Sequence, residues 1–449
     1  MQMVCKTGKL SSLSRIKRVA AITLGCKVNL YDTQAMLELF QNKGYEIVPF
    51  GSEADIYIIN TCTVTNMGDK KSRQMIQRAA KHNTLVIVTG CYAQMNPEAV
   101  KRIRGVNLVL GTKERERIVE IAEAYSDNMG VYSYVSDVRS ETDIELLRVT
   151  KFYTDGRTRA FLKIQDGCDN FCSYCIIPYA RGPARSREPD DVLSEAHRLS
   201  VNGYKEIVLT GIHAASYGKD LKNTSLVEIL LLLNEIKGIE RIRLSSIDPV
   251  IVNREFIKVL SSLPKLCDHF HLSLQSGCNS VLRRMNRHYT AEHYRESADM
   301  LKAAFPGGSL TTDIIAGFPG ETQAEFEQTL IFVEKIGFMK IHVFPFSPKT
   351  GTDAASMPNQ VSDTIKSKRV ALLMEISKGS GQAFMEAFIG KALKVLIEKQ
   401  HETGVFEGHA TNYIKVRTRS LTNIVNQIKI VRVDRVQHDC VYGSILHNG

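Results

Sequence analysis

The sequence predicts an α/β protein in three parts: an N-terminal open parallel α/β sheet, a central partial TIM-type (β/α) barrel and a small C-terminal β-barrel. Two series in which predicted strands and helices alternate indicate the first two parts, because this alternation is typical of parallel sheets covered by helices. A change to short strands without intervening helices after Gly390 indicates the third part. We expect the parts to span residues 17–127, 154–386 and 387–449.

The first series runs from Arg18 to about Ala124. Its predicted strands are short and apolar, and they lie in VAAITLG, YEIVPF, ADIYIINT, TLVIVTG and NLVLGT. A helix is predicted in DTQAMLELFQNKG, a basic helix after Asn66 and a further helix from Pro97. Residues 125–155 lose the alternation, and we interpret them as a linker that could add an edge strand.

The second series contains six predicted strands separated by helices such as DDVLSEAHRLSVNG. The strands lie in RAFLKIQ, KEIVLTG, RIRLSSI, HFHLSLQ, SLTTDIIAG and KIHVFPFS. A long helix around residues 363–388 closes the series. In barrels of this type functional groups gather at the C-terminal ends of the strands, so we expect the site there.

Composition limits the class of protein. The formal net charge of +10 favours an anionic partner, of which nucleic acid is the commonest. The longest apolar run, Leu226 to Ile236, contains acids and is too short to cross a bilayer, so we expect no membrane attachment. Residues 1–20 are basic and acid-free, and we interpret the stretch before Arg18 as a terminal extension rather than an organellar transit peptide. Ten cysteines in an expected cytoplasmic chain favour metal binding or catalysis over disulfides.

Three cysteines lie close together in QDGCDNFCSYCIIPYARG, directly after the first strand of the second series: Cys168, Cys172 and Cys175. Zinc in a structural site normally has four ligands, so zinc would require a distant fourth residue. A cubane iron–sulfur cluster on three thiolates leaves one iron free for a small molecule. The C-x3-C-x2-C spacing is the signature of radical S-adenosylmethionine (SAM) enzymes, in which SAM occupies that iron, and we favour this interpretation over zinc.

Small and polar residues follow the other strands of the second series. A charged cofactor such as SAM would suit such a rim, although each residue could instead begin a loop or cap a helix. Tyr174 could pack beside an adenine or stabilise the cysteine loop. The candidate SAM-contacting residues are Tyr174, Thr210, Gly211, Ser245, Gln275 and Asp313, with His213 and Ser246 beside them.

A second set of cysteines lies in the N-terminal part, where Cys26, Cys62 and Cys91 each follow a predicted strand. A parallel sheet would bring all three to one edge, which is where ligands of open α/β sheets bind. A single buried cysteine would indicate only packing. Three at equivalent strand ends favour a shared metal site with one open position. We expect the other four cysteines to be unligated: Cys5, Cys267, Cys278 and Cys440.

Two basic segments could bind RNA or form ordinary solvated surfaces. One is the helix after Cys62, which carries Lys70, Lys71, Arg73 and Arg78. The other is a strand of the C-terminal barrel with Lys415, Arg417 and Arg419, where Tyr413 could provide an aromatic platform.

The two cysteine sets together make the sequence resemble the methylthiotransferases over nearly its whole length. The motifs that carry the resemblance are TLGCKVNLYDTQ, NTCTVTN, VTGCYAQ and KIQDGCDNFCSYCIIPYARG. Within the family, Lys27, Val28 and Asn29 after the first cysteine favour the bacterial enzymes that act on threonylcarbamoyladenosine in tRNA. Relatives that modify isopentenyladenosine in tRNA, or an aspartate of a ribosomal protein, carry other residues there and remain alternatives.

The resemblance implies an N-terminal domain with an auxiliary [4Fe-4S] cluster on Cys26, Cys62 and Cys91. It also implies a radical SAM barrel with a second [4Fe-4S] cluster on the other three cysteines, and a C-terminal TRAM domain that binds RNA. One SAM would supply the methyl group of the transferred sulfur. A second would give the radical that abstracts hydrogen from carbon 2 of the adenine at position 37, next to the anticodon. An electron donor such as flavodoxin or ferredoxin is implied. The alternative from another class is a non-catalytic RNA-binding protein that holds zinc.

Overall fold

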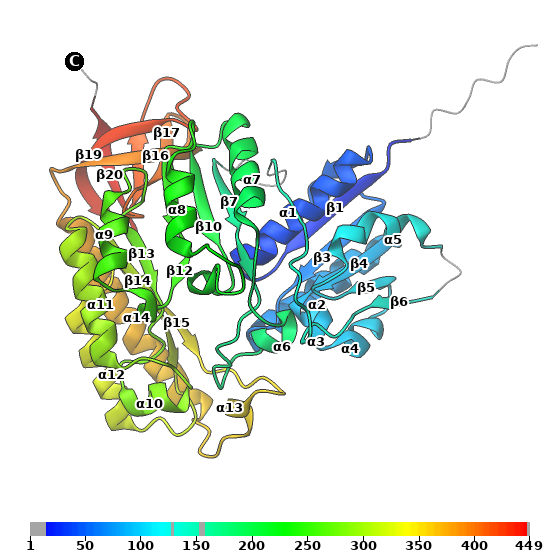
Figure 1. The fold of residues 1–449 in the computed structure, drawn as a ribbon, viewed down its shortest axis with the longest axis horizontal. Helices are drawn as coiled ribbons and strands as arrows, with labels where there is room; N and C mark the ends of the chain where they lie inside the picture. Colours follow the sequence, from blue (N-terminus) through cyan, green and yellow to red (C-terminus); the bar gives the residue numbers. More distant parts are fainter. Residues whose placement is uncertain (1–14, 127–129, 152–157, 447–449) are drawn as a thin grey trace, which may run out of the picture.

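The computed structural model of the protein describes residues 15–126, 130–151 and 158–446. Three bodies of secondary structure are visible in Figure 1: the N-terminal sheet in blue and cyan, the central barrel in green and yellow, and a small barrel in red. Most of the basic extension before Arg18, including Cys5, lies outside the described residues. None of the described helices is long and apolar enough to cross a membrane.

The N-terminal sheet is parallel throughout, with the strand order β2-β1-β3-β4-β5-β6. Its strands are β1 (Arg18–Thr23), β2 (Glu46–Val48), β3 (Ile56–Thr61), β4 (Leu85–Gly90), β5 (Leu108–Leu110) and β6 (Tyr132–Tyr134). Its helices are α1 (Lys27–Asn42), α2 (Asn66–Ala79), α3 (Cys91–Met95), α4 (Pro97–Lys101) and α5 (Ile118–Ala124). Separate apolar cores on the two faces confirm a covered parallel sheet, and β6 is the edge strand that the linker could add.

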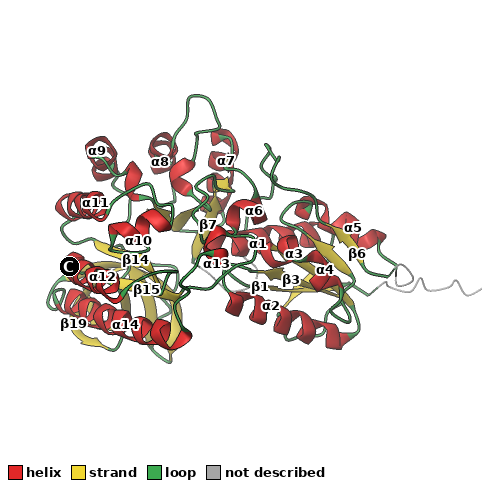
Figure 2. Ribbon diagram, turned by 90° about the horizontal axis from the view of Figure 1, so that it is seen from below, coloured by secondary structure: helices red, strands yellow, loops and turns green. Residues whose placement is uncertain are grey.

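Helix α1 is unusual because it buries polar residues as well as apolar ones. Asn29, Asp32 and Thr33 are all at most 1% exposed. The reason is that α1 lies between its own sheet and the central barrel, against β7 (Figure 2). The Tyr31 hydroxyl, for example, donates to Glu195 of α7 over 2.9 Å. The N-terminal sheet is therefore fixed to the barrel through a polar surface.

The central part is a parallel arc of strands with helices on its outer side (Figure 2). Its strands are β7 (Arg159–Lys163), β10 (Glu206–Thr210), β11 (Arg241–Leu244), β12 (Ser246–Ile247), β13 (His269–Leu272), β14 (Ser309–Ala316) and β15 (Lys340–Pro345). Its longer helices are α7 (Pro189–Val201), α8 (Leu226–Asn234), α9 (Arg254–Ser262), α11 (Ala291–Ala304), α12 (Gln323–Ile336) and α14 (Asp363–Glu386). Short elements are β8 (Gln165–Asp166), β9 (Arg185–Ser186), α6 (Ile177–Arg181), α10 (Asn279–Arg284) and α13 (Asp353–Ser356). In the described residues these strands form two hydrogen-bonded sheets, β11-β10-β7 and β12-β13-β14-β15, and the barrel is open between β7 and β15, so it is partial, as the sequence predicts.

The C-terminal part is a closed barrel with the strand order β16-β17-β18-β20-β19. The strands are β16 (Ala392–Glu402), β17 (Val405–Ala410), β18 (Lys415–Arg419), β19 (Ile428–Gln437) and β20 (Cys440–Ile445). Alternating residues such as Val395, Val416 and Val431 fill its interior, and Met385 of α14 extends this core. The predicted small β-barrel is thus confirmed.

Candidate functional site at the domain junction

Cys26, Cys62 and Cys91 lie at the carboxyl ends of β1, β3 and β4, as the sequence predicts. These three strands are neighbours in the sheet, so the fold brings the cysteines together at one edge. Burial raises the pKa of Cys62 to about 12, and the thiols of Cys91 and Cys26 act on it in the same direction. Burial also raises the pKa of Cys91.

Gly25 makes room for this group of cysteines. Its backbone has φ +103, and a Cβ at this position would lie 2.9 Å from the Cys62 Sγ. Any other residue would therefore press on the thiol as well as strain the backbone. Position 25 requires glycine because the Cys62 side chain fills the space that a side chain on residue 25 would need.

The second cysteine set lies in the loop between β8 and α6. Its backbone is fixed by Cys168 N–H donating to the Gly182 carbonyl at 3.1 Å and by Cys175 N–H donating to the Cys172 carbonyl at 2.8 Å. Burial raises the pKa of Cys168 to about 11 and that of Cys175 to about 12, with the neighbouring Cys172 adding to both shifts. Arg287 donates from Nη1 to Cys172 Sγ at 3.2 Å.

Arg181, the last residue of α6, connects the two cysteine sets. Its Nη1 contacts Asp166 at 2.7 Å, two residues before Cys168 in the segment of the second set. Its Nη2 donates to Asn29 Oδ1 at 2.6 Å and to Asp32 Oδ2 at 3.0 Å, both on α1. Although burial raises the pKa of Cys91, Arg181 opposes that rise by its charge and by hydrogen bonding. One fully buried guanidinium thus touches both sides of the junction.

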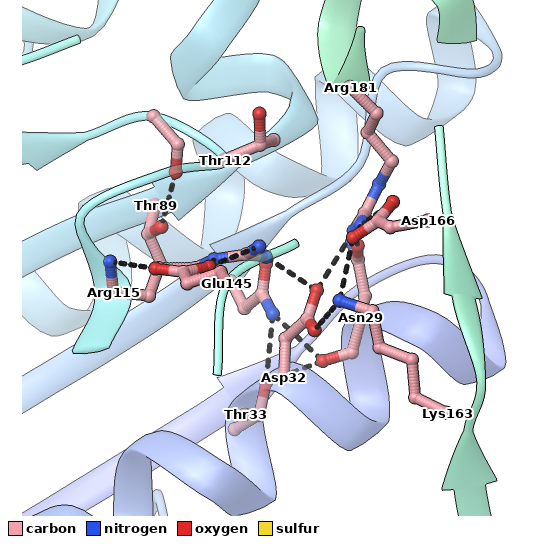
Figure 3. A network of polar contacts seen from close by, with 12 residues as sticks. Asn29, Asp32, Thr33, Thr89, Thr112, Arg115, Glu145, Lys163, Asp166 and Arg181 are labelled. Atoms are coloured by element: carbon pink, nitrogen blue, oxygen red, sulfur yellow. Dashed lines mark hydrogen bonds and ion pairs between the residues drawn. The ribbon is translucent and has the colours of Figure 1, made fainter. Parts of the chain in front are cut away.

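A network of buried charges surrounds Arg181, and we call it the junction network (Figure 3). Lys163 of β7 contacts Asp32 at 2.9 Å and Asp166 at 2.6 Å. Arg115 pairs with Asp32 and, through Nε, donates to Glu145 at 2.7 Å. The network contains three cations and three carboxylates from both parts of the chain: Arg115, Lys163, Arg181, Asp32, Glu145 and Asp166.

The candidate SAM-contacting residues differ in their positions. Thr210 ends β10, but its hydroxyl is buried and donates to the Val208 carbonyl at 3.0 Å. The buried Ser245 hydroxyl has no hydrogen-bond partner within the described ranges. Gly211 faces Gln165, since a Cβ there would lie 3.0 Å from Gln165 Oε1.

The remaining rim candidates are Tyr174, Gln275 and Asp313. Tyr174 packs edge-on against Phe318, with ring centroids 6.5 Å apart, so it anchors the cysteine loop on the barrel. Gln275 has a positive φ of 69° just beyond β13. Asp313 lies within β14 and approaches His271 at 3.3 Å, which places it deeper in the barrel than the strand ends. Their contact with SAM stays a prediction.

A cavity of about 510 Å³ lies between β1 and α1 on one side and the base of the barrel on the other. Cys26 and Lys27 line it beside Arg159, Arg243 and Tyr413. We call it the basal cavity. Burial lowers the pKa of Lys27; Tyr413 opposes this shift, while Arg159 and Arg243 add to it.

The interpretation of Tyr413 as an outer RNA platform is wrong. Its ring is stacked between His269 and His409, at centroid distances of 4.5 Å and 4.8 Å, at the contact of the two barrels. The aromatic ring with arginines on the outer surface is instead Tyr442. Arg417 and Arg435 lie over it at 5.9 Å and 4.7 Å, beside a groove of about 830 Å³.

The basic face of α2 is exposed, as expected from Lys70, Lys71, Arg73 and Arg78. Two of the arginines lie against aromatic rings: Arg73 is 5.9 Å from the centre of the Tyr92 ring, and Arg78 is 5.9 Å from that of Phe50.

Sequence reasoning missed Arg287 and every member of the junction network. Arg181 and Asp32 do stand inside the motifs YARG and LYDTQ, next to the cysteines, which is the one available signal. Nothing in the sequence indicates that they pair with each other, since 149 residues separate them.

Comparison with known proteins agrees with this geometry. The model of the Radical SAM superfamily matches residues 162–333, and that of Uncharacterized protein family UPF0004 matches residues 18–111. The chain is 43% identical to the threonylcarbamoyladenosine tRNA methylthiotransferase MtaB of Bacillus subtilis, over 92% of this chain and 93% of that protein. It belongs to the radical SAM methylthiotransferase family. The methylthiotransferase MtaB of Thermotoga maritima is 38% identical, with 95% and 96% covered.

Other relatives of this methylthiotransferase carry a different name. A tRNA-2-methylthio-N(6)-dimethylallyladenosine synthase of Thermoanaerobacter is 37% identical, over 84% of this chain and 81% of that protein. Among solved structures, the radical SAM methyltransferase TsrM of Kitasatospora setae aligns with a TM-score of 0.56 and 15% identity, covering 76% and 77% of the chains. This likeness supports the radical SAM fold. SAM and iron–sulfur clusters of the [4Fe-4S] type are the cofactors of this enzyme class.

The cysteine sets of the methylthiotransferase fit such clusters. Buried thiols with raised pKa values become stable thiolates when a metal supplies positive charge. The buried Arg181 Nε has no hydrogen-bond partner among the residues that the structure describes. Its N–H can therefore donate a hydrogen bond to a sulfur atom beside Cys91. Among the same residues, no three Cys, His, Asp or Glu side chains are arranged to hold a single metal ion. The ligands of a cubane bind separate irons and need no such convergence.

Proposed function

We propose that this enzyme transfers a methylthio group to carbon 2 of N6-threonylcarbamoyladenosine in tRNA, next to the anticodon. The observation that carries the proposal is the connection of the two cysteine sets through Arg181 in a chain whose relatives are named tRNA methylthiotransferases. In this proposal Cys168, Cys172 and Cys175 hold the [4Fe-4S] cluster at which SAM is cleaved. A second [4Fe-4S] cluster is held by Cys26, Cys62 and Cys91.

The chemistry requires a shielded junction. When bound, the clusters supply the electron that generates a radical from SAM and the site that presents sulfur. An aromatic C–H is too weak an acid for a side-chain base, so the protein's part is to position the base and exclude water. The junction network contributes to positioning the base, because it holds α1 of the N-terminal sheet and β7 of the barrel in a fixed relation. Ser245, with its free hydroxyl, and Gln275 are the rim residues best suited to orient SAM.

RNA would reach the junction along two basic surfaces. Helix α2, which carries the exposed cations, starts four residues after Cys62, and the Tyr442 groove with Arg417 and Arg435 lies on the C-terminal barrel. A base of a single-stranded loop can be splayed into a pocket, as a stacked duplex base cannot. We propose that the parts are an N-terminal cluster domain (17–127), a radical SAM domain (154–386) and an RNA-binding domain (387–449). An electron donor such as flavodoxin or ferredoxin would supply electrons in the cytoplasm.

Relatives and residues together favour threonylcarbamoyladenosine as the substrate. The relatives named MtaB are 35–43% identical over at least 92% of the chain, and the dimethylallyladenosine synthases are 36–37% identical over 84–88%. The KVN sequence after Cys26 also favours the first group. Nucleoside mass spectrometry of tRNA from a deletion strain tests this choice. Loss of the methylthio group from threonylcarbamoyladenosine is expected, whereas its loss from dimethylallyladenosine would contradict the proposal.

The two-cluster assignment is tested with cysteine variants purified without oxygen. The wild-type chain should contain about eight irons and eight sulfides, as two cubanes require. Cys172→Ala should abolish reductive SAM cleavage, whereas Cys62→Ala should keep it and lose methylthio transfer. Cys440→Ala, which changes a cysteine of the C-terminal barrel, is the control and should keep both activities. Zinc without sulfide in the wild type, or transfer by Cys62→Ala, would overturn the assignment.

A further inference from the structure

The basal cavity is strongly cationic. Its lining residues among those described include Lys27, Arg159 and Arg243 and no Asp or Glu. The three cations come from α1, β7 and β11, so it is the fold that brings these positive charges together. Cations gathered in a partly enclosed space repel one another, and the two arginines have carboxylate partners behind the cavity, so Lys27 is the cation whose charge is left for a ligand to offset.

The two arginines are held rigidly from behind. Arg243 pairs with Glu206 at 2.8 Å and donates to the Thr411 carbonyl at 2.8 Å. Arg159 pairs with Glu398 at 3.2 Å. Both guanidinium groups also lie over the Tyr413 ring, at 4.9 Å and 5.5 Å from its centre. Their positions are therefore set before any ligand binds, which reduces the entropy cost of binding.

Lys27 differs from the two arginines because it lacks a partner. Within the described residues it makes no hydrogen bond or ion pair, although it lines the same cavity as Arg159 and Arg243. Its side chain stays accessible to solvent inside the cavity. Asp313 and Tyr413 act on its pKa, but neither forms a pair with it. An accessible ammonium without a partner, next to two fixed guanidinium groups, is a site for a carboxylate.

We propose that the basal cavity binds the carboxylate of the substrate's threonylcarbamoyl group, with Lys27 as its direct partner and Arg159 and Arg243 as supporting cations. This inference rests on the proposed function and names the residues that select its substrate. The cavity starts at Cys26, beside the proposed reaction site, and extends to Tyr413 at the base of the barrel. Carbon 2 and the N6 substituent lie on either side of N1 of the adenine, so a base with carbon 2 at the cysteines can direct its carboxylate into the neighbouring cavity.

The same charges would select against the alternative substrate. A dimethylallyl group is apolar and carries nothing that pairs with a cation. Placing it in the cavity would remove water from Lys27 without providing an acceptor, which costs free energy. Lys27 would therefore contribute to specificity both by attracting a carboxylate and by rejecting an apolar group.

The experiment compares three anticodon stem-loop RNAs on the full-length, cluster-loaded enzyme, with binding measured by fluorescence anisotropy without oxygen. One RNA carries threonylcarbamoyladenosine, one the glycine analogue that keeps the carboxylate, and one the neutral carboxamide of the threonyl group. Wild-type enzyme should bind the two carboxylates with similar Kd and the carboxamide on the order of tenfold more weakly. Lys27→Met should bind all three RNAs alike, and Lys27→Arg should restore the preference.

Lys258→Met is the matched control, because it removes a lysine on the outer surface of α9 and should keep the wild-type preference. Equal binding of carboxylate and carboxamide RNAs by the wild type would overturn the inference, as would an undiminished preference in Lys27→Met. Mass spectrometry of the RNAs after turnover tests the proposed function separately. A carboxylate preference without methylthio transfer would refute the proposed reaction only, and transfer without a preference would refute the inference only.

Discussion

Two charge clusters of this methylthiotransferase differ in their balance. The junction network has three cations and three carboxylates, and each carboxylate pairs with at least one cation. The cluster around the basal cavity has four cations, namely Arg159, Arg241, Arg243 and Lys27, but only the carboxylates Glu206 and Glu398 pair with them. The first cluster is closed and neutral, whereas the second is open to solvent and positive.

This difference separates two uses of buried charge. A balanced network with good geometry holds two parts of a fold in register, and breaking it leaves an uncompensated charge. An unbalanced cluster gives up part of that stability and keeps attraction for a ligand. Substitutions should therefore destabilise the fold most in the junction network, less at the paired Glu206 of the basal cluster, and least at Lys27, which has no partner within the described residues.

The largest effect is expected for Asp32→Asn. Burial raises the pKa of Asp32, but the charges of Arg115, Lys163 and Arg181 lower this pKa by more, so it lies below its ordinary value. Removing this charge leaves three buried cations with two carboxylates, and the free energy of unfolding should fall by about 3–5 kcal/mol. Urea denaturation followed by circular dichroism measures this fall in the free energy of unfolding. A loss below about 1 kcal/mol would show that the network is not needed for stability.

An intermediate, pH-dependent effect is expected for Glu206→Gln. Burial raises the pKa of Glu206, but the charges of Arg243 and Arg241 oppose this shift and lower the pKa to about 2. Because the unfolded value is about 4.3, this carboxylate stabilises the fold above about pH 4, by roughly 3 kcal/mol. The contribution disappears as the pH falls towards 2. The wild type should therefore lose stability over this window more steeply than Glu206→Gln, and parallel curves from pH 6 to 2.5 would contradict this prediction.

The smallest effect on stability is expected for Lys27→Met, in comparison with Lys163→Met. Both substitutions remove a lysine that lies between the N-terminal sheet and the barrel. Lys163 has two carboxylate partners, at 2.6 Å and 2.9 Å, whereas Lys27 has none within the described residues. Lys27→Met should change the unfolding free energy by about 0.5 kcal/mol or less, and Lys163→Met should lower it by several times as much. Equal losses would remove the distinction between the two clusters.

Local patterns in the sequence were sufficient to predict most of the fold. Alternating strands and helices indicated both parallel sheets, and cysteines directly after β1, β3 and β4 indicated a common edge. That inference needed only the rule that parallel strands end on the same side. The C-terminal strands were likewise visible as short alternating runs without helices between them, such as KALKVLIEK.

Contacts between distant segments were not predictable from one sequence. Asp32 and Lys163 are 131 residues apart, and nothing local to either indicates its partner. Tyr413 looked like an exposed platform beside basic residues, but the docking of the two barrels turns it inward against His269. Asp313 was expected within its strand, but its approach to His271 of the neighbouring strand was not predictable.

The inward position of Tyr413 has a consequence for the role of the C-terminal barrel. Tyr413 has φ +66 in the turn after β17, and its ring covers part of the basal cavity at the base of the central barrel. A chain that ends at residue 386 would lack this ring and would admit more bulk water to the basal cavity. We therefore expect the reactive species to be quenched sooner in such a chain, with SAM consumed but little product formed.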